Sequence, residues 1–235
     1  KTLVYDFNTG FIDFEDEHLT FNRKWFLDLL EKIIAEFGEQ KLELRAMNGM
    51  FPGSLDETTI IKMKKAGFTA LNLSLCTISR EQLKRFNRPY TGDDFSKVLE
   101  IADSYDLPAT GYIITGAPGQ DPFESVNDLI FLAEKKVLAG VSVFYPSPGS
   151  SDFERCRSLN LLPEHLTQMR ATALPIGDTT SRIEALTILR LGRILNFMKS
   201  IQDHSQSRSD TRIELGQRAL ELFFEDGLIR GASKE

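Results

Sequence analysis

Cysteine and histidine are scarce in this chain, which has two cysteines and three histidines among 235 residues. Cys76 and Cys156 lie far apart in the sequence, and no ligand spacing relates them to His18, His165 or His204. Two such cysteines form neither a disulfide framework nor a structural zinc site, which takes about four ligands. The sequence therefore predicts no metal site and a reducing, cytoplasmic location.

Long apolar runs and an excess of basic residues are also missing. No run approaches the roughly 18 residues that span a bilayer, and no signal peptide is visible. The 28 basic residues are outnumbered by 34 acidic ones, which gives a net charge of -6 and a pI of about 5.3. We therefore expect no membrane span and no nucleic-acid partner. The partner is expected to be a small-molecule substrate of unknown identity, and the sequence does not indicate an oligomeric state.

What the chain does contain, up to about residue 151, is an alternation of short apolar runs with helical patterns, typical of a parallel α/β sheet. The last turn of a helix is expected before Gly10, which would place the start of the chain inside a βα unit whose strand is missing. Five strands cannot close an eight-stranded barrel, so an open, partial barrel is expected. Strands are predicted at 11–14, 42–47, 68–75, 108–115 and 141–145, and helices at 21–37, 54–65, 79–86, 93–105 and 122–136.

After residue 151 the strand signals end, so we divide the chain into a barrel domain at 1–151 and a helical C-terminal extension at 152–235. Apolar residues at helical spacing predict a long amphipathic helix over 181–201, and a second helix is expected over 212–224 after a polar linker. The first of these helices is expected to pack over the barrel, with a position at a membrane surface as the alternative.

Working groups of parallel α/β folds lie at the carboxyl ends of the strands. After the first strand come Asp16 and Glu17, with His18 beside them. These carboxylates could accept hydrogen bonds from an ammonium group, could bind a metal, or could form a solvated acidic loop. Asn48 follows the second strand and is either a ligand contact or part of a polar turn.

The third, fourth and fifth strand ends carry small or ring-bearing residues. Ser74 and Cys76 could bond ribose hydroxyls or could simply end a strand, and Cys76 alone is expected to be a buried small residue rather than a nucleophile. The stretch 111–119 includes Thr115, Gly116 and Pro118; glycines there allow close approach of a ligand or a tight turn, but their spacing is not that of a dinucleotide or Walker loop.

Two further residues complete the candidate set. Tyr145 begins a rigid turn at 145–149 that could present backbone groups to a flat ring. Arg88, which follows Lys84 and Arg85, carries a guanidinium that suits a carboxylate, with a surface salt bridge as the alternative.

Taken in order, these segments resemble the radical S-adenosylmethionine (SAM) superfamily, and more narrowly the branch whose catalytic barrel often follows a cobalamin-binding domain. The resemblance covers about 140 residues, from near residue 8 to near residue 151, and rests on the ordered set rather than on one motif. It is carried by IDFEDE at 12–17, AMNGM at 46–50, MKKAGF at 63–68, LNLSL at 71–75, LKRFNRP at 83–89, the stretch 111–119 and YPSPGS at 145–150.

The resemblance implies a partial (β/α)6 TIM-like barrel that binds a [4Fe-4S] cluster and SAM. By similarity, Asp16 and Glu17 match the positions that hold the SAM amino group, Arg88 one that can hold its carboxylate, and Ser74 and Cys76 the strand end that contacts the ribose. The segment 116–119 and Tyr145 match strand ends that flank the adenine. In that family the reduced cluster cleaves SAM into methionine and a 5′-deoxyadenosyl radical, which abstracts hydrogen from the substrate.

Two departures from the family pattern are present. Related sequences often carry Glu at the position of Cys76, and the family's Cys-x-x-x-Cys-x-x-Cys loop, which follows the first barrel strand, is absent. The chain is either cut just downstream of that loop, which its missing first strand favours, or it is a degenerate domain that has lost the cluster. Cobalamin would belong to a separate upstream domain.

The sequence thus predicts the catalytic-core fragment of a radical SAM Fe-S enzyme that modifies or methylates an unknown substrate and is inactive in the form given. One alternative is a non-catalytic binding or scaffold domain on a degenerate barrel. The other is a metal-dependent α/β enzyme that uses Asp16, Glu17 and His18.

Overall fold

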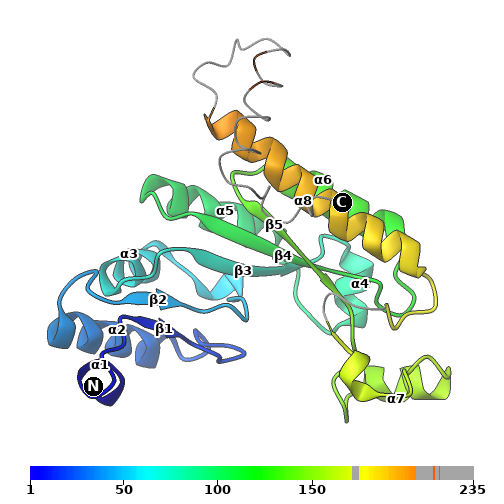
Figure 1. Cartoon of the computed structure of the whole chain (residues 1–235), viewed down its shortest axis with the longest axis horizontal. Helices are drawn as coiled ribbons and strands as arrows, with labels where there is room; N and C mark the ends of the chain where they lie inside the picture. Colours follow the sequence, from blue (N-terminus) through cyan, green and yellow to red (C-terminus); the bar gives the residue numbers. More distant parts are fainter. Residues whose placement is uncertain (171–174, 205–213, 215–216, 218–235) are drawn as a thin grey trace. The chain divides into compact units, whose positions relative to one another are not determined.

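Parallel strands and helices alternate through the computed structural model, which describes residues 1–170, 175–204, 214 and 217 (Figure 1). The elements are α1 (Thr2–Tyr5), β1 (Phe11–Asp13), α2 (Arg23–Phe37), β2 (Glu43–Arg45), a 3-10 turn at Pro52–Ser54, α3 (Glu57–Ala66), β3 (Leu71–Cys76), α4 (Arg80–Arg85), α5 (Gly92–Ser104), β4 (Ala109–Thr115), α6 (Pro122–Ala133), β5 (Leu138–Val143), α7 (Ser151–Ser158), a 3-10 turn at Leu166–Gln168 and α8 (Arg182–His204).

The strands form one parallel pair and one three-stranded sheet, β1-β2 and β3-β4-β5. Two isolated parallel bridges, Leu44 with Phe68 and Met50 with Leu73, connect the β2 region to the β3 region. The strands therefore follow one another in chain order, as the predicted open barrel of five strands requires. The prediction of an α/β partial barrel is confirmed.

The chain divides into two compact units. Unit 1 contains residues 1–113 and 130–138, and unit 2 contains residues 114–129 and 139–235. The boundary runs through β4, whose first five residues belong to unit 1. The predicted division at residue 151 was drawn from a change in sequence character and stays a prediction.

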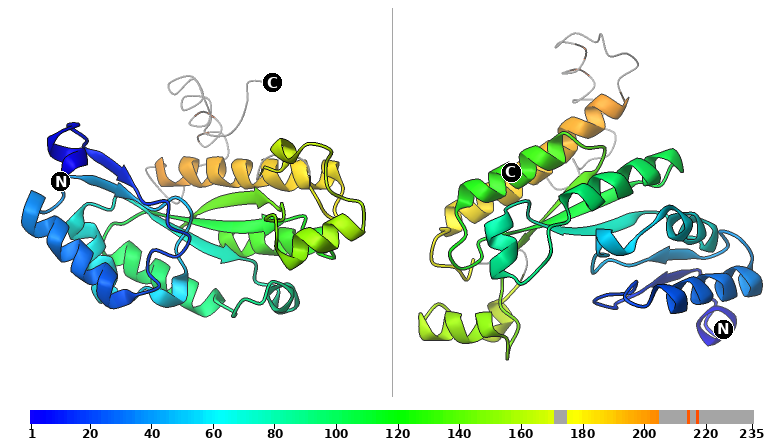
Figure 2. Two further views of the ribbon diagram at one scale, coloured as in Figure 1. Left: turned by 90° about the horizontal axis from the view of Figure 1, so that it is seen from below. Right: turned by 180° about the vertical axis from the view of Figure 1, so that it is seen from behind.

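Unit 1 folds around apolar side chains from β1–β4 and from the helices. Helices α2 and α3 lie side by side (Figures 1 and 2), with Lys62 of one paired with Glu31 of the other. The Phe68 ring stacks on Phe14 at 6.1 Å between centroids and meets the buried Phe26 edge-on at 6.3 Å. This aromatic group attaches α2 to the start of the β3 segment.

Caps and a glycine set the ends of α3. Asp56 accepts a hydrogen bond from the Thr59 backbone at 2.8 Å, which satisfies one of the free N–H groups at the helix start. Gly67 ends the helix in the left-handed region at φ +116°, as its sequence position predicted. A Cβ at Gly67 would lie 1.9 Å from the Leu42 carbonyl oxygen, so the glycine also permits close packing onto the backbone just before β2.

Unit 2 is closed by α8, which runs alongside α6 (Figures 1 and 2). A Cβ at Gly192 would lie 2.7 Å from the Val141 side chain on β5, so the two elements are in close contact. The Asn196 side chain makes two hydrogen bonds to Ala139 on β5, from the Ala139 N–H at 2.7 Å and to the Ala139 carbonyl at 2.9 Å. This helix therefore packs against the last strand, and the expectation that it packs over the barrel as a whole stays a prediction.

Several bounds differ from the predicted elements: β2 is limited to Glu43–Arg45, β3 begins at Leu71 rather than residue 68, and α6 ends at Ala133 rather than residue 136. The last strand begins at Leu138 rather than residue 141, and two short helical segments, α7 and the turn at Leu166–Gln168, had not been predicted. The helix expected over 212–224 lies outside the described residues, apart from 214 and 217. No helix among the described residues is long and apolar enough to cross a membrane.

Candidate functional site

The loops that follow β1 and β2 are joined by two hydrogen bonds in unit 1. The Met47 backbone donates to Asp13 Oδ1 at 3.1 Å, and the Asn48 side chain donates to the Glu15 carbonyl at 2.8 Å. Asp16, directly after Glu15, is exposed. The structure therefore places Asn48 beside the acidic loop, as expected for neighbouring carboxyl ends of parallel strands.

Backbone contacts bring the same segment against the end of β3. The Met50 N–H donates to the Asn72 carbonyl at 2.7 Å, and the Ser74 N–H donates to the Met50 carbonyl at 2.8 Å. Gly49 has φ +89°, and a Cβ there would lie 3.4 Å from the Ser74 Cβ. Only a residue that tolerates this conformation lets the chain turn so close to Ser74.

Arg88 reaches the same strand end. Its Nη1 donates to the Ser74 hydroxyl oxygen at 3.3 Å, and the arginine is half-buried in the loop after α4. The described residues include no carboxylate within ion-pair distance of Arg88. Asn48, Ser74 and Arg88 thus lie on one connected set of strand ends, with the guanidinium available to an anionic ligand.

The sheet face that carries Ser74 is polar. Side chains alternate between the faces of a strand, and a Cβ on Gly111 would lie 2.6 Å from Phe95 and 2.9 Å from Leu132, which marks its face as the helix side. Tyr112, the register partner of Ser74, therefore lies on the opposite face.

A hydrogen bond crosses this polar face. The Tyr112 hydroxyl donates to Asn72 Oδ1 at 3.2 Å, and burial raises the pKa of the phenol, so it stays a donor at neutral pH. Sequence reasoning missed both residues. The signal was present in β4, where Thr110 and Tyr112 alternate with small and apolar residues.

Cys76 occupies the bulge between β3 and β4. It is 1% exposed and has φ +68°, and the register shifts between Ser74 and Cys76. The expectation that Cys76 is a buried small residue is confirmed. Its burial leaves Ser74 as the accessible polar group at this strand end, while the predicted ribose contact of Cys76 stays a prediction.

In unit 2 the loop after β4 is held in shape by hydrogen bonds from the side chain of one of its own residues, Gln120. Gln120 accepts from the Ala117 N–H at 3.1 Å and donates to the Ile114 carbonyl at 3.0 Å. Gly116 has φ +79°, and Pro118 is buried. These two candidate residues therefore sit in a rigid turn, the arrangement that a flat ligand would need.

A segment of the C-terminal extension, residues 175–180, closes over that loop. The Gly119 N–H donates to Asp178 Oδ1 at 2.8 Å, and the Thr179 hydroxyl donates to the Gln120 carbonyl at 2.6 Å. A Cβ at Gly177 would lie 2.4 Å from the Gly116 carbonyl oxygen. The glycine at 177 thus lets this segment pack directly against the Gly116 backbone.

Thr115 and Tyr145 complete the unit 2 candidates. Thr115 is fully buried, and its hydroxyl has no hydrogen-bond partner among the described residues. Its carbonyl accepts from the Phe144 N–H at 2.8 Å, which sets the start of the turn that carries the exposed Tyr145. The prediction that these two residues and those of unit 1 line one cavity stays a prediction.

The acidic loop shows no metal centre. Glu17 and His18 are exposed, and the His18 ring contacts Phe21 and Phe51 at 5.6 and 5.8 Å between centroids. No group of three or more His, Cys, Asp or Glu side chains in the described part of the chain could hold a metal ion. The metal-dependent alternative therefore has no support from this loop.

The chain's cysteines do not fit an iron–sulfur cluster. A [4Fe-4S] cluster is held by several thiolates, and the whole sequence has two cysteines. Both are buried, Cys76 in unit 1 and Cys156 in unit 2, where burial and the nearby Asp152 raise the pKa of the Cys156 thiol. A thiol of this kind resists the deprotonation that ligation needs.

Two solved structures that share this fold are described as radical SAM enzymes, whereas no protein-family model and no curated protein matches the sequence. The radical SAM methyltransferase TsrM from Kitasatospora setae, with cobalamin and a [4Fe-4S] cluster bound, is 17% identical with a TM-score of 0.52 over 60% of this chain and 28% of its own. The coproporphyrinogen III oxidase HemN from Escherichia coli is 18% identical with a TM-score of 0.52 over 91% of this chain and 46% of its own.

Methylornithine synthase PylB is similar to the same degree, with 17% identity and a TM-score of 0.50 over 80% of this chain and 48% of its own. The chain therefore has the radical SAM fold, and it spans between about a quarter and a half of the length of these proteins.

Proposed function

We propose that this chain is the SAM-binding core of a radical SAM enzyme and that SAM binds at the carboxyl ends of β1–β3 in unit 1. The observation that carries the proposal is the connected set Glu15–Asn48–Ser74–Arg88, which lies at strand ends in a chain with the radical SAM fold. The structure contains the polar groups that a zwitterionic nucleoside needs, namely carboxylates, a guanidinium, a hydroxyl and a rigid glycine turn.

The proposed roles follow from the chemistry of each group. Asp16 and Glu17 would accept from the SAM amino group, because ionised carboxylates are acceptors only. Arg88 would donate two parallel bonds to the SAM carboxylate, and Ser74, whose hydroxyl accepts from Arg88, would donate to a ribose oxygen. Taken by itself, the unit 2 turn at Gly116 and Pro118, with Thr115 and Tyr145, is proposed to contact a flat ring such as adenine.

The 235 residues alone do not supply the ligands of an iron–sulfur cluster, so their own role is to hold and orient SAM. We propose that the cluster ligands, and cobalamin where it is used, belong to the remainder of a longer protein. The partial length relative to TsrM, PylB and HemN supports this. A non-catalytic scaffold is the competing proposal, and it predicts no SAM affinity.

The first experiment measures SAM binding to the purified chain by calorimetry. We expect binding that Arg88→Lys weakens by about 1–3 kcal/mol, because lysine keeps the charge but loses the two-pronged donor. Arg190→Lys, an exchange at an exposed arginine of α8, is the matched control and should change nothing. Absence of SAM binding, or equal affinity of the Arg88→Lys variant and the wild type, would refute the proposed site.

The second experiment tests whether the cluster ligands lie outside these 235 residues. After anaerobic incubation with iron and sulfide, the chain should show no [4Fe-4S] absorption and should form no 5′-deoxyadenosine from SAM and a reductant. The full-length parent protein, treated identically, should show both. A stable cluster with SAM cleavage by the 235 residues alone would show that the assignment of the cluster ligands outside them is wrong.

A further inference from the structure

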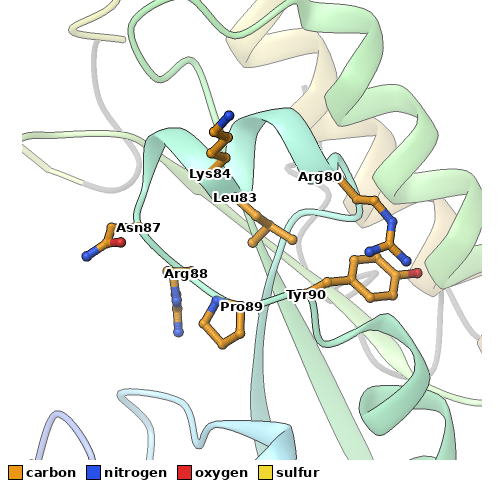
Figure 3. A pocket seen from close by; sticks show the side chains of 7 residues that line it. All are labelled: Arg80, Leu83, Lys84, Asn87, Arg88, Pro89 and Tyr90. Carbon is orange, nitrogen blue, oxygen red and sulfur yellow. The ribbon is translucent and has the colours of Figure 1, made fainter.

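A basic pocket lies beside α4 in unit 1 (Figure 3). It has a cavity volume of about 510 Å³ and is lined by Arg80, Leu83, Lys84, Asn87, Arg88, Pro89 and Tyr90. This volume lies within the range of small-molecule sites. Three of the seven lining residues are cationic and none is acidic, although acidic residues outnumber basic ones in the chain as a whole.

The three cations are not neutralised by the protein. Arg80, Lys84 and Arg88 form no ion pair with any carboxylate in the described part of the chain. Their helix neighbour Arg85 behaves differently, because it pairs with Glu81 at 2.9 Å. The cation outside the pocket lining, Arg85, is therefore neutralised by an ion pair, whereas the positive charges of the lining residues are not.

The pocket is also ordered by its own contacts. The Arg80 guanidinium lies over the Tyr90 ring at 4.0 Å from the centroid, and the Arg88 guanidinium donates to Ser74 at 3.3 Å. A Cβ at Gly92 would lie 2.4 Å from the Tyr90 hydroxyl, so the Tyr90 ring can occupy this position only because residue 92 is a glycine. Two of the cations are thus held in position before any ligand arrives, which lowers the entropic cost of binding.

Figure 3 shows how the charges are distributed. Leu83 lies at the centre, Arg80 and Tyr90 at one side, and Lys84 and Arg88 extend from other sides. Leu83 is 2% exposed and forms an apolar floor. Cations placed around an apolar centre match a ligand with more than one negative charge better than they match a single carboxylate.

We propose that this pocket binds a small, multiply charged oxyanion, either a phosphate compound or a polycarboxylate, at a site that adjoins the proposed SAM site and shares Arg88 with it. SAM carries one carboxylate, for which Arg88 alone would serve, so Arg80 and Lys84 are the residues specific to this pocket. Asn87 adds an amide donor at the rim.

Titration calorimetry of the 235-residue chain with pyrophosphate, citrate and acetate at constant ionic strength tests the proposal. Sub-millimolar binding of pyrophosphate or citrate, with no measurable binding of acetate, is expected. Tighter binding of pyrophosphate identifies phosphate as the source of the charge, and tighter binding of citrate identifies carboxylates. The assay contains no SAM, so its result is independent of the proposed function.

Matched variants locate the site. Arg80→Gln combined with Lys84→Gln should weaken binding of the preferred anion at least tenfold, because two of three cations are removed. Lys24→Gln combined with Lys32→Gln removes the same charge from exposed positions of α2 and should leave affinity within twofold. Circular dichroism confirms folding, and Arg80→Lys with Lys84→Arg should retain most of the affinity.

Three results would overturn the proposal. The first is failure of pyrophosphate and citrate to bind with a dissociation constant below about 1 mM. The second is an equal loss of affinity in the pocket and α2 variants, and the third is binding of acetate as tight as that of pyrophosphate or citrate. The second result would mean that net charge alone attracts the anions.

Discussion

Replacing Asn196 with alanine tests how the last strand of the sheet is completed. The Asn196 side chain accepts from the Ala139 N–H at 2.7 Å and donates to the Ala139 carbonyl at 2.9 Å. Ala139 is 7% exposed, so its two backbone groups lose their partners where water has poor access. Each unsatisfied buried group costs about 1–3 kcal/mol, and partial hydration places the expected total near 2–4 kcal/mol.

Urea unfolding followed by circular dichroism measures the loss, and hydrogen exchange locates it. We expect a lower unfolding midpoint and faster exchange of the Ala139 amide. Thr187→Ala is the control, because this exposed residue of the same helix only donates to the Ile183 carbonyl of its own helix, at 2.8 Å. An Asn196→Ala variant within about 0.5 kcal/mol of the Thr187→Ala variant would refute the reasoning.

Asn196→Asp adds a pH test of the same contact. A carboxylate could still accept from the Ala139 N–H, but its second oxygen would face the Ala139 carbonyl, so the folded state favours the protonated acid and its pKa rises. The variant should therefore be closest to wild type well below the unfolded pKa of about 3.9 and lose stability as the pH rises above it. If the difference in unfolding free energy between Asn196→Asp and the wild type did not change with pH, the new carboxylate oxygen would not face the Ala139 carbonyl.

Three further predictions concern other parts of the chain. Gly67→Ala should cost more than about 3 kcal/mol in urea unfolding, because φ is +116° and the Cβ would lie 1.9 Å from the Leu42 oxygen, whereas Gly10→Ala meets nothing within 4 Å and should be neutral. Burial alone would raise the pKa of Asp56, but its hydrogen bonds from Thr59 and Arg23 outweigh this effect and lower the pKa. The stability that Asp56 contributes is therefore present above about pH 3.9 and is lost as the pH falls below it. Asp56→Asn should reduce the free energy of unfolding at pH 7 and should make that free energy depend less on pH in the acid range. Both cysteines should react slowly with iodoacetamide at pH 8 until urea is added, since both are buried; rapid labelling of the native chain would contradict their placement.

The alternating architecture could be predicted because its signals are local. In α2 the apolar residues recur about every 3.6 residues, and in α3 Asp56 caps the start while Gly67 ends the helix. Each of these signals depends only on residues within about one helical turn. Helix α7 was missed because its sequence, SDFERCRS, is largely polar and has only Phe153 and Cys156 to bury. Its start is set by the Ser150 hydroxyl, which accepts from the Phe153 N–H at 3.1 Å.

The candidate site was predicted in part, for a related reason. Strand-end residues such as Asn48 and Ser74 follow from parallel topology, so their proximity in unit 1 could be anticipated. The Tyr112–Asn72 bond could not, because the face on which a strand residue lies depends on the neighbouring register. The contact of Asp178 with Gly119 spans 59 residues and has no local signal at all.

The closure of residues 175–180 over the loop after β4 has a thermodynamic consequence. The loop's backbone groups are already bonded, at Ala117 and Ile114 by the Gln120 side chain and at Gly119 by Asp178. A loop held in this way has little conformational freedom left to lose, so a ligand that meets it should bind with a small entropic penalty and without rearranging it. Changes in the C-terminal extension, such as Asp178→Ala, should therefore alter ligand affinity through the disorder of the free protein rather than through a lost contact.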